Sequence, residues 1–345
     1  MNYLDADSFI QKNSIPIIDV RSPAEYEKGH ITGSVNIPLF SDQERHFVGI
    51  EYKKMGKVEA IAKGLQFVGP KMQILAEQAK NLDKNKARKI YCWRGGMRSE
   101  KMAWLFELLG MQCSILNGGY KSYRNKMLDD FIGIEHLTVL HGSTGCAKTE
   151  ILQELSNLGE QVIDLEEIAN HRGSTFGHLG KNEQPTSQQF QNNIHSRLLN
   201  FDFTKRIWVE AESLKIGNVN LPDTLWMKMK KADVIEIKMD TKIRANKLAD
   251  DYGHFPLSDL LSGIERISDG LGGDRTKLAM QNLKTGKLAQ TAEILLDYYD
   301  RTYEFTRQRF RDRSLCVINL DTNDPKKNAR VILDHFQLIE KTVVV

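Results

Sequence analysis

Short apolar runs alternate with segments of helical periodicity along the chain. Each run has the length of a buried strand, and the segments between them repeat apolar residues at the three- and four-residue spacing of one helix face. This alternation predicts an α/β architecture with parallel sheets. The expected strands cover residues 15–20, 89–92, 113–116, 137–141, 161–165, 206–210, 234–239 and 315–320.

The pattern is interrupted near residues 127–135. An Asn-Gly-Gly turn and a polar helix over 120–130 close one unit, and a new strand then opens another. A chain of 345 residues has the length of two or three ordinary domains. We therefore expect one domain over 1–130 and a second over 131–345, the latter with a basic, helical C-terminal part.

A basic, helix-prone stretch between Pro38 and Pro70 is too long for an ordinary connection. It fits a solvated helical insertion or a contact with substrate or the other domain, and the sequence does not choose between them. Its basic residues are Arg45, Lys53, Lys54, Lys57 and Lys63.

Composition narrows the class of protein. Lys and Arg number 48 against 45 Asp and Glu, and 41% of residues are hydrophobic, which excludes a disordered chain or a coiled-coil rod.

No apolar run is long enough to span a membrane, and the N-terminal segment, with Asp5 and Asp7, does not resemble a secretion signal. Four cysteines without a Cys-x-x-Cys pair predict a cytoplasmic protein with free thiols and no structural metal.

The first chemical site is a cysteine between a predicted strand and helix. Cys92 ends the strand, and Ser99 is the expected N-cap of the helix. A glycine-containing loop with arginines can turn its N–H groups inward, bind an oxyanion and favour a thiolate. The alternative is a small buried hydrophobe. The residues expected to bind the anion are Arg94, Gly95, Gly96, Arg98 and Ser99.

A second strand–loop–helix segment fits a phosphate-binding P-loop at every position but one. Ala147 stands where glycine is usual, and its methyl group would crowd a phosphate or strain the loop. Lys148 would neutralise the charge of a diphosphate, and the Thr149 hydroxyl could bind Mg²⁺. We expect no functional role for the thiol of Cys146. The expected diphosphate-binding residues are Gly142, Ser143, Thr144, Gly145, Lys148 and Thr149.

Polar residues elsewhere in the second domain could support this loop. Glu210 and Glu212 follow an apolar strand, where an acidic residue commonly holds Mg²⁺ through water; exposed strand-end carboxylates are the alternative. Asp164 and Arg172 belong to a polar, glycine-rich segment over 164–180 that fits a functional loop or a mobile surface loop. No residues here have the spacing of a metal site.

The C-terminal third is rich in arginine and aromatic residues. Arginine suits phosphate contacts and aromatic rings suit base stacking, so this segment fits an RNA contact or an ordinary amphipathic helix. The arginines concerned are Arg301, Arg307, Arg309, Arg311 and Arg313.

Four motifs of the first domain resemble the rhodanese family. They are the Asp-Val-Arg and Gly-His-Ile motifs within 16–38, the cysteine loop at 92–99 and the Leu-Asn-Gly-Gly turn at 116–119. The resemblance implies a cysteine that carries sulfur or selenium. Cys92 to Arg98 is one residue longer than the usual sulfurtransferase loop and also matches the Cys-x5-Arg-Ser loop of cysteine phosphatases.

The whole chain, over about 4–325, resembles the tRNA 2-selenouridine synthase family through its CWRGGMRS, GSTGCAKT and ANHRGSTFG segments. The resemblance implies that wobble 2-thiouridine in tRNA is S-geranylated from geranyl diphosphate, and that selenium from selenophosphate then replaces the geranylthio group. Cys92 would handle the chalcogen, its loop would hold selenophosphate, and residues 142–149 would bind the diphosphate. We expect a monomer that acts on tRNA away from membranes.

Two other functions stay open on sequence grounds. One is a cysteine phosphatase fused to a P-loop kinase, which would use the Cys-x5-Arg loop and ATP. The other is a non-catalytic RNA-binding regulator, which would not need Cys92.

Overall fold

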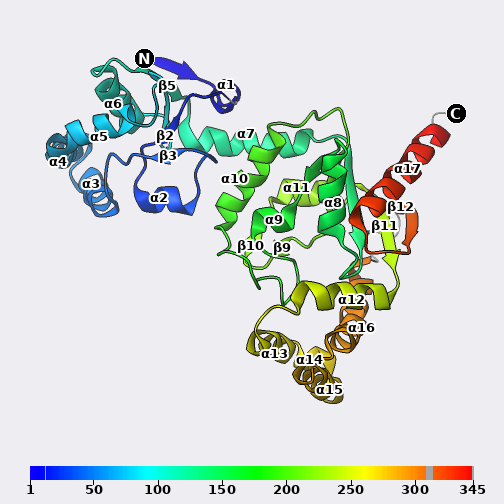
Figure 1. The fold of residues 1–345 in the computed structure, drawn as a ribbon. Coiled ribbons are helices and arrows are strands. Elements are labelled where there is room, and N and C mark those ends of the chain that lie inside the picture. Colours follow the sequence, from blue (N-terminus) through cyan, green and yellow to red (C-terminus); the bar gives the residue numbers. More distant parts are fainter. Residues whose placement is uncertain (12, 308–313, 344–345) are drawn as a thin grey trace. The chain divides into compact units, whose positions relative to one another are not determined.

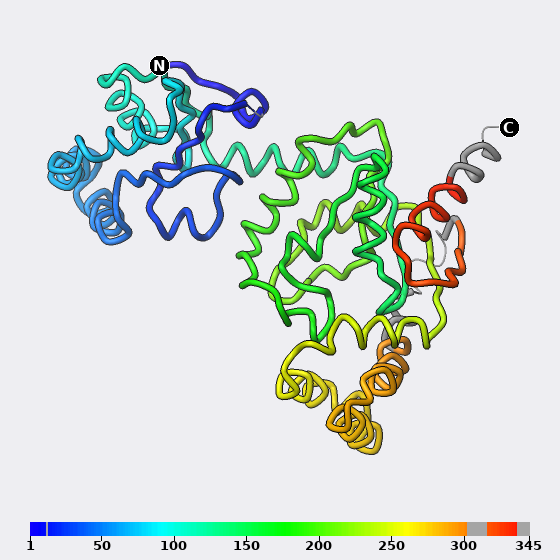
Figure 2. Tube along the Cα trace, viewed as in Figure 1, coloured from blue at the N-terminus to red at the C-terminus, as the bar shows by residue number. Residues whose placement is uncertain are grey.

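The computed structural model describes the chain except residues 12, 308–313 and 344–345. It contains two compact units, and Figures 1 and 2 trace the chain through them. Unit 1 comprises Met1–Asp130 together with Gln191–Leu199, and unit 2 comprises Phe131–Phe190 and Asn200–Val345. The sequence predicted a division between residues 130 and 131, with residues 191–199 in the second domain, whereas Gln191–Leu199 belongs to unit 1 in the structure.

Unit 1 is built on a parallel five-stranded sheet in the order β1-β5-β4-β2-β3. Side chains alternate across the central strand, so that Ile90 packs into the apolar cluster on one face and Tyr91 into the cluster on the other. The strands are β1 (Asn2–Leu4), β2 (Ile17–Asp19), β3 (Val35–Asn36), β4 (Ala87–Tyr91) and β5 (Gln112–Leu116).

Helices connect these strands in the βαβ manner that a parallel sheet requires. The expected insertion after Pro38 is helical and forms α3 and α4, and α3 buries none of its residues. The helices are α1 (Ala6–Ile10), α2 (Pro23–Lys28), α3 (Asp42–Lys54), α4 (Lys57–Val68), α5 (Met72–Lys80), α6 (Met97–Glu107) and α7 (Gly119–Gly133), with a 3-10 turn at Gly69–Lys71.

Unit 2 contains a second parallel five-stranded sheet, in the order β12-β11-β6-β8-β7, and a small antiparallel pair, β9 and β10. The central strand β6 is buried along its whole length, as expected for a strand covered on both faces. The strands are β6 (Leu137–Gly142), β7 (Gln161–Ile163), β8 (Ile207–Glu210), β9 (Lys215–Ile216), β10 (Val219–Asn220), β11 (Asp233–Met239) and β12 (Ser314–Leu320).

The helices of unit 2 pack on its sheet or gather in a helical layer from α12 to α16 (Figure 1). No helix in the described part of the chain is long and apolar enough to cross a membrane. The helices are α8 (Lys148–Asn157), α9 (Leu165–Ala169), α10 (Ser187–Leu198), α11 (Asp223–Met229), α12 (Thr241–Tyr252), α13 (Leu257–Arg266), α14 (Ser268–Leu271), α15 (Gly273–Lys284), α16 (Leu288–Arg307) and α17 (Pro325–Val343).

All of the expected strands are present, with small differences at their ends. The strand expected to reach residue 165 stops at Ile163, because the Asp164 carboxylate accepts a hydrogen bond from Glu167 N at 2.8 Å and caps α9. The expected N-cap of α6 is wrong. Gly96 caps that helix and its carbonyl already accepts from Glu100 N at 3.2 Å, so Ser99 lies within the first turn.

The expected arginine-rich segment is only partly described. Helix α16 extends to Arg307, and Arg301 pairs with Asp297 at 3.0 Å. Arg309, Arg311 and Arg313 lie outside the described residues. RNA contact by this segment therefore stays a prediction.

Gln191–Leu199, which includes most of α10, is held within unit 1 by buried polar contacts. Asn192 Nδ2 donates to Tyr120 Oη at 2.6 Å and to the His30 carbonyl at 2.8 Å, and its Oδ1 accepts from Arg124 Nη1 at 2.8 Å. His195 Nε2 lies 2.8 Å from Asp130 Oδ2. These contacts link residues far apart in sequence, which explains why the linear pattern did not reveal them.

Replacing Asn192 by alanine should lower the free energy of unfolding by about 1–3 kcal/mol, because buried groups lose hydrogen-bonding partners. Urea unfolding of the full chain measures this loss. Lys101→Ala, an exposed change on α6, is the control and should alter stability by less than about 0.5 kcal/mol. Equal stability of the two variants would show that the Asn192 contacts do not hold unit 1 together.

Two candidate active sites

Cys92 lies at the carboxyl end of β4, the central strand of unit 1, and is only 4% exposed. Its Sγ is 3.3 Å from Ser99 Oγ, which in turn donates to the Gly96 carbonyl at 2.9 Å. The structure thus brings Cys92, Gly96 and Ser99 together. The hydroxyl of Ser99 therefore lies between the thiol of Cys92 and the Gly96 carbonyl, and Ser99 does not cap the helix.

The cysteine loop is fixed by close contact with the start of α7. Gly95 and Gly119 both have positive φ, and a Cβ on Gly119 would clash with the Cys92 carbonyl and Gly95 N. The carbonyls of Cys92 and Trp93 accept from the N–H groups of Tyr120 and Lys121, at 2.8 and 3.1 Å. Residues 119–121 therefore hold the loop, a role beyond the turn that the sequence indicated.

The two arginines of this loop differ in their surroundings. Arg94 is exposed, whereas Arg98 Nη1 pairs with Glu25 Oε2 at 2.7 Å. Burial acts to raise the pKa of Glu25, but the Arg98 guanidinium outweighs it and the pKa is lowered from its usual value. The sequence did not foresee this pair, which orients Arg98 from outside the loop.

A buried ion pair fixes the strand next to β4. Arg21 Nη2 lies 2.6 Å from Asp19 Oδ2 and donates to the Gly29 carbonyl at 2.7 Å. The Arg21 guanidinium carbon is 4.0 Å from the ring centroid of Tyr120. The Asp-Val-Arg and Gly-His-Ile motifs are therefore joined in space, and they support the aromatic residue that starts α7.

The phosphate loop of unit 2 runs from the end of β6 to the start of α8, so the helix N-terminus faces the loop. Lys148 Nζ donates to the Gly142 carbonyl at 2.9 Å, and Gly145 adopts φ 82°. The structure thus places residues 142–149 in the expected strand–loop–helix arrangement.

Ala147 strains the backbone of this loop, which is one of the two effects that the sequence predicted for an alanine in place of glycine. Its φ of 58° and ψ of 32° are left-handed, which costs a residue with a Cβ about 1–2 kcal/mol. Its methyl group is buried in the apolar cluster that also contains Leu140 and Ile151. Cys146 is buried beside it, and burial raises the pKa of that thiol, which agrees with an incidental role.

Carboxylates gather behind the phosphate loop. Thr149 Oγ1 donates to Glu166 Oε2 at 2.8 Å, and Glu166 N donates to Glu210 Oε1 at 2.7 Å. Burial, with the charge of Glu166 added, raises the pKa of Glu210 well above its usual value and that of Glu212 to about 8. Burial also raises the pKa of Asp164 to about 6.

Glu210 Oε2 is buried and has no hydrogen-bonding partner. The structure therefore brings the expected carboxylates together and adds Glu166, which the sequence did not single out. Its position on a short helix two residues after Asp164 was the available signal.

Arg172 lies in the loop that covers this cluster. A Cβ on the following residue, Gly173, would clash with the carboxylates of Glu166 and Glu212. The Arg172 guanidinium carbon is 5.4 Å from the Tyr252 ring centroid, and its Nη1 is buried without a hydrogen-bonding partner. Residues 172 and 173 of the loop over 164–180 thus lie against the carboxylate cluster and Tyr252.

An apolar pocket adjoins the phosphate loop. Thr144 of the loop and Tyr252 belong to its lining, and most of the remaining wall is aliphatic. Helices α12, α13, α15 and α16 and the segment after Arg172 supply that wall, which includes Phe176, Leu248, Leu260, Ile264, Leu283, Leu288, Leu295 and Leu296.

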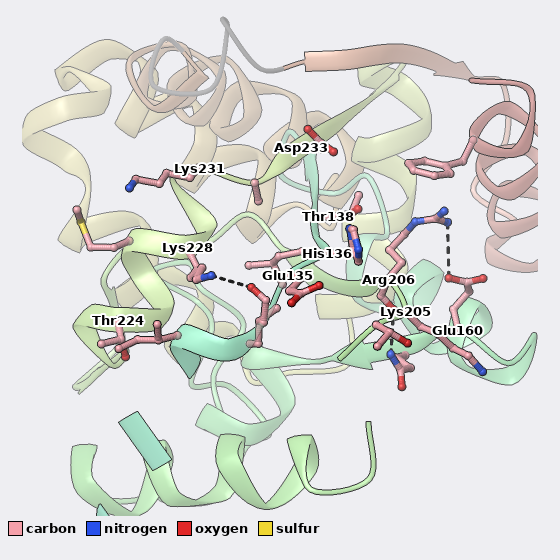
Figure 3. Close-up of a pocket in the computed structure, with 18 of the residues that line it drawn as sticks. Glu135, His136, Thr138, Glu160, Lys205, Arg206, Thr224, Lys228, Lys231 and Asp233 are labelled. Atoms are coloured by element: carbon pink, nitrogen blue, oxygen red, sulfur yellow. Dashed lines mark hydrogen bonds and ion pairs between the residues drawn. The ribbon is translucent and has the colours of Figure 1, made fainter. Parts of the chain in front are cut away.

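A broader pocket lies at the other edge of the same sheet, around the amino ends of its strands (Figure 3). Lys228 Nζ donates there to the Ile134 carbonyl at 2.8 Å, and Arg206 lies 3.8 Å from Glu160. Basic and acidic side chains alternate in its lining, and none of the expected site residues belongs to it.

Known proteins match both units. The family model for the rhodanese-like domain matches residues 4–126, and the model for the tRNA 2-selenouridine synthase AAA domain matches residues 135–265. A rhodanese-like domain protein from Staphylococcus aureus is 20% identical over 36% of this chain and 91% of that chain, with a TM-score of 0.23. The N-terminal domain of a putative ATP/GTP binding protein from Clostridium difficile 630 is 40% identical over 37% of this chain and 99% of that chain, with a TM-score of 0.36.

Curated relatives match most of the chain. The tRNA 2-selenouridine synthase of Bordetella petrii is 34% identical over 87% of this chain and 88% of its own. That of Shewanella denitrificans is 33% identical over 85% of this chain and 80% of its own. Together with the matched domains, these relatives confirm the expected fold of a rhodanese-like domain followed by a P-loop domain, and the chain belongs to the tRNA 2-selenouridine synthase family.

Proposed function

We propose that this protein converts wobble 2-thiouridine in tRNA to 2-selenouridine through an S-geranylated intermediate. The observation that carries the proposal is that one family match extends over both units, and that each unit has a glycine-containing loop at the N-terminus of a helix. Because the substrate is tRNA, we expect the protein to act in the cytoplasm.

In the first step, the sulfur of 2-thiouridine attacks the C1 carbon of geranyl diphosphate, the carbon–oxygen bond to diphosphate breaks, and the base loses its N3 proton to solvent. Negative charge then develops on the leaving diphosphate, where fixed cations and N–H groups lower the barrier. We assign this role to Lys148 and the first N–H groups of α8, because Lys148 is the first residue of that helix. Arg172, with its buried and unpartnered Nη1, is a further donor for the same group.

The apolar pocket beside Thr144 favours an isoprenoid over a nucleotide. Burial of hydrocarbon in an aliphatic pocket is favourable, whereas a ribose and a base need polar partners that its lining largely lacks. We therefore propose that the diphosphate occupies residues 142–149 and the geranyl chain enters this pocket.

In the second step, the selenium of selenophosphate attacks C2 of the base, the C2–S bond breaks, and geranylthiol leaves with a proton. Attack of water on phosphorus then breaks the phosphorus–selenium bond, releases phosphate and leaves selenium on C2. We propose that the loop of Cys92 holds the selenophosphate through the N–H groups of Gly95 and Gly96, with Arg94 and Arg98 supplying positive charge. Cys92 Sγ, beside Ser99 Oγ, would then handle the chalcogen.

The carboxylates behind the phosphate loop fit a Mg²⁺ ion bound with the diphosphate. Thr149 Oγ1 and the carboxylates of Glu166 and Glu210 would hold it directly or through water, and the ion would neutralise the leaving group. The unpartnered Glu210 Oε2 is the observation that fits a cation. No group of three or more acidic, His or Cys side chains among the described residues is arranged to hold a metal ion. Mg²⁺ in phosphate sites takes most of its ligands from water and phosphate.

Two variants separate the two steps. Lys148→Ala should slow geranylation by about 100-fold or more, because the leaving group loses a cation. Cys92→Ser should leave geranylation intact and abolish selenation, so that the geranylated nucleoside accumulates.

Mass spectrometry of wobble nucleosides measures both products, with Lys101→Ala as the control. Equal loss of both steps in each variant would contradict the division of labour. Hydrolysis of an aryl phosphate without any change in the tRNA would favour the phosphatase–kinase alternative.

Filling the apolar pocket should separate isoprenoid binding from diphosphate binding. Ala249→Phe places a ring in the pocket and should weaken geranyl diphosphate binding at least about tenfold, while leaving inorganic diphosphate binding unchanged. Calorimetric titration measures both affinities, and Asn246→Ala on the exposed side of α12 is the matched control. Undiminished affinity for geranyl diphosphate would place the isoprenoid elsewhere.

The raised pKa of Glu212 predicts how stability depends on pH. The folded state holds a proton on Glu212 up to about pH 8, whereas an unfolded glutamic acid loses it near pH 4.3. The folded state therefore binds more protons across this window, and stability falls as pH rises through it.

Glu212→Gln should lessen this fall, giving a higher Tm than the unmodified chain at pH 8 and a similar Tm near pH 5. Differential scanning calorimetry measures the two profiles. Glu183→Gln, at an exposed position, should follow the unmodified chain. A Glu212→Gln profile parallel to that of the unmodified chain would show that Glu212 titrates normally.

A further inference from the structure

Unit 1 exposes an aromatic ring on the residue that comes next to the buried cysteine in the chain. Trp93 follows Cys92 in the chain, yet 38% of Trp93 is exposed whereas Cys92 is 4% exposed. A large apolar ring at the entrance to a polar, anion-binding loop adds nothing to the binding of selenophosphate. Its position needs another explanation.

The inner side of this ring rests on a rigid support. Its centroid is 5.9 Å from that of Tyr120, which is fully buried. Tyr120 is held by the hydrogen bond from Asn192 and by the Arg21 guanidinium. The Trp93 carbonyl accepts from Lys121 N, so both main chain and ring are fixed. A surface that is ordered in advance loses little entropy when a ligand binds.

The chemistry that fits such a surface is a flat, unstacked nucleobase. Proteins recognise single-stranded loops of RNA by stacking splayed bases on aromatic rings, and one such stack contributes about 1–3 kcal/mol of affinity. Arg94, the next residue, is exposed and adds positive charge beside the ring. A base stacked on Trp93 would lie at the loop that also carries Cys92.

We propose that Trp93 is the stacking surface for the wobble base, and that it positions this base beside Cys92. The inference rests on the proposed function, since it takes the substrate to be a nucleotide in an anticodon loop. The inference goes beyond the proposed function because it assigns recognition of the base to the ring of Trp93. The thiol and the anion-binding groups have other roles.

A double-mutant cycle between the protein and the RNA tests this assignment. The full chain is titrated, without geranyl diphosphate or selenophosphate, with an anticodon stem-loop that carries 2-thiouridine at the wobble position. The same stem-loop without a base at that position is the second ligand. The protein variants are Trp93→Ala, Trp93→Leu and Trp93→Phe, with Trp104→Ala as control because Trp104 is 45% exposed on the neighbouring helix α6.

Trp93→Ala and Trp93→Leu should each weaken binding of the thiolated stem-loop by about 5- to 150-fold, the range expected for one base–aromatic stack. Trp93→Phe, which keeps a flat ring, should retain most of the affinity. None of the variants should change the affinity for the stem-loop that lacks the base, and Trp104→Ala should bind both ligands like the unmodified chain.

The outcomes distinguish this inference from the proposed function. If Trp93→Leu binds the thiolated stem-loop as tightly as the unmodified chain, or loses equal affinity for both ligands, Trp93 does not stack on the wobble base. If Trp93→Leu gives either of these two results while the unmodified chain selenates tRNA, the assignment of Trp93 is wrong and the proposed function stands. If the unmodified chain binds neither stem-loop and leaves thiolated tRNA unchanged, the proposed function fails as well. Thermal unfolding of each variant identifies any that is misfolded, and Trp93→Leu keeps apolar packing on Tyr120 if Trp93→Ala does not fold.

Discussion

The close contact between Gly95 and Gly119 is the constraint on which the chemistry of unit 1 depends. Their backbones approach so closely that neither position has room for a side chain, and the carbonyls of Cys92 and Trp93 are bonded to the start of α7. The thiol and the exposed ring consequently have fixed positions before any substrate binds. Preorganisation of this kind lowers the entropy lost on binding and keeps reacting groups in place.

The two units reach their sites by the same structural route. In each, a buried central strand of a parallel sheet ends in a glycine-containing loop, and a helix begins directly afterwards. Ligands of open α/β sheets bind at the carboxyl ends of the strands, where helix N-termini favour anions. The surroundings then separate the two sites. Unit 1 offers a thiol and an exposed tryptophan, whereas unit 2 offers a lysine, buried carboxylates and an apolar pocket.

Local sequence was sufficient to predict the longer strands and both loops, because each is encoded by a continuous run of apolar and glycine residues. Contacts between distant residues were not predictable in this way. Glu25 meets Arg98, and Asn192 meets Tyr120, through the fold alone. The very short strands β3, β9 and β10 are too brief to show a period. The error at Ser99 has a local cause, since the Gly96 carbonyl starts the helix before the serine is reached.

The central claim is that one chain carries out two successive substitutions on the same base. Mass spectrometry of wobble nucleosides tests it most directly, using thiolated tRNA and the unmodified protein with each co-substrate omitted in turn. The account predicts S-geranyl-2-thiouridine with geranyl diphosphate alone, and 2-selenouridine only when selenophosphate is also present. Selenation at an undiminished rate without geranyl diphosphate, or no change in the nucleoside with both co-substrates, would contradict it.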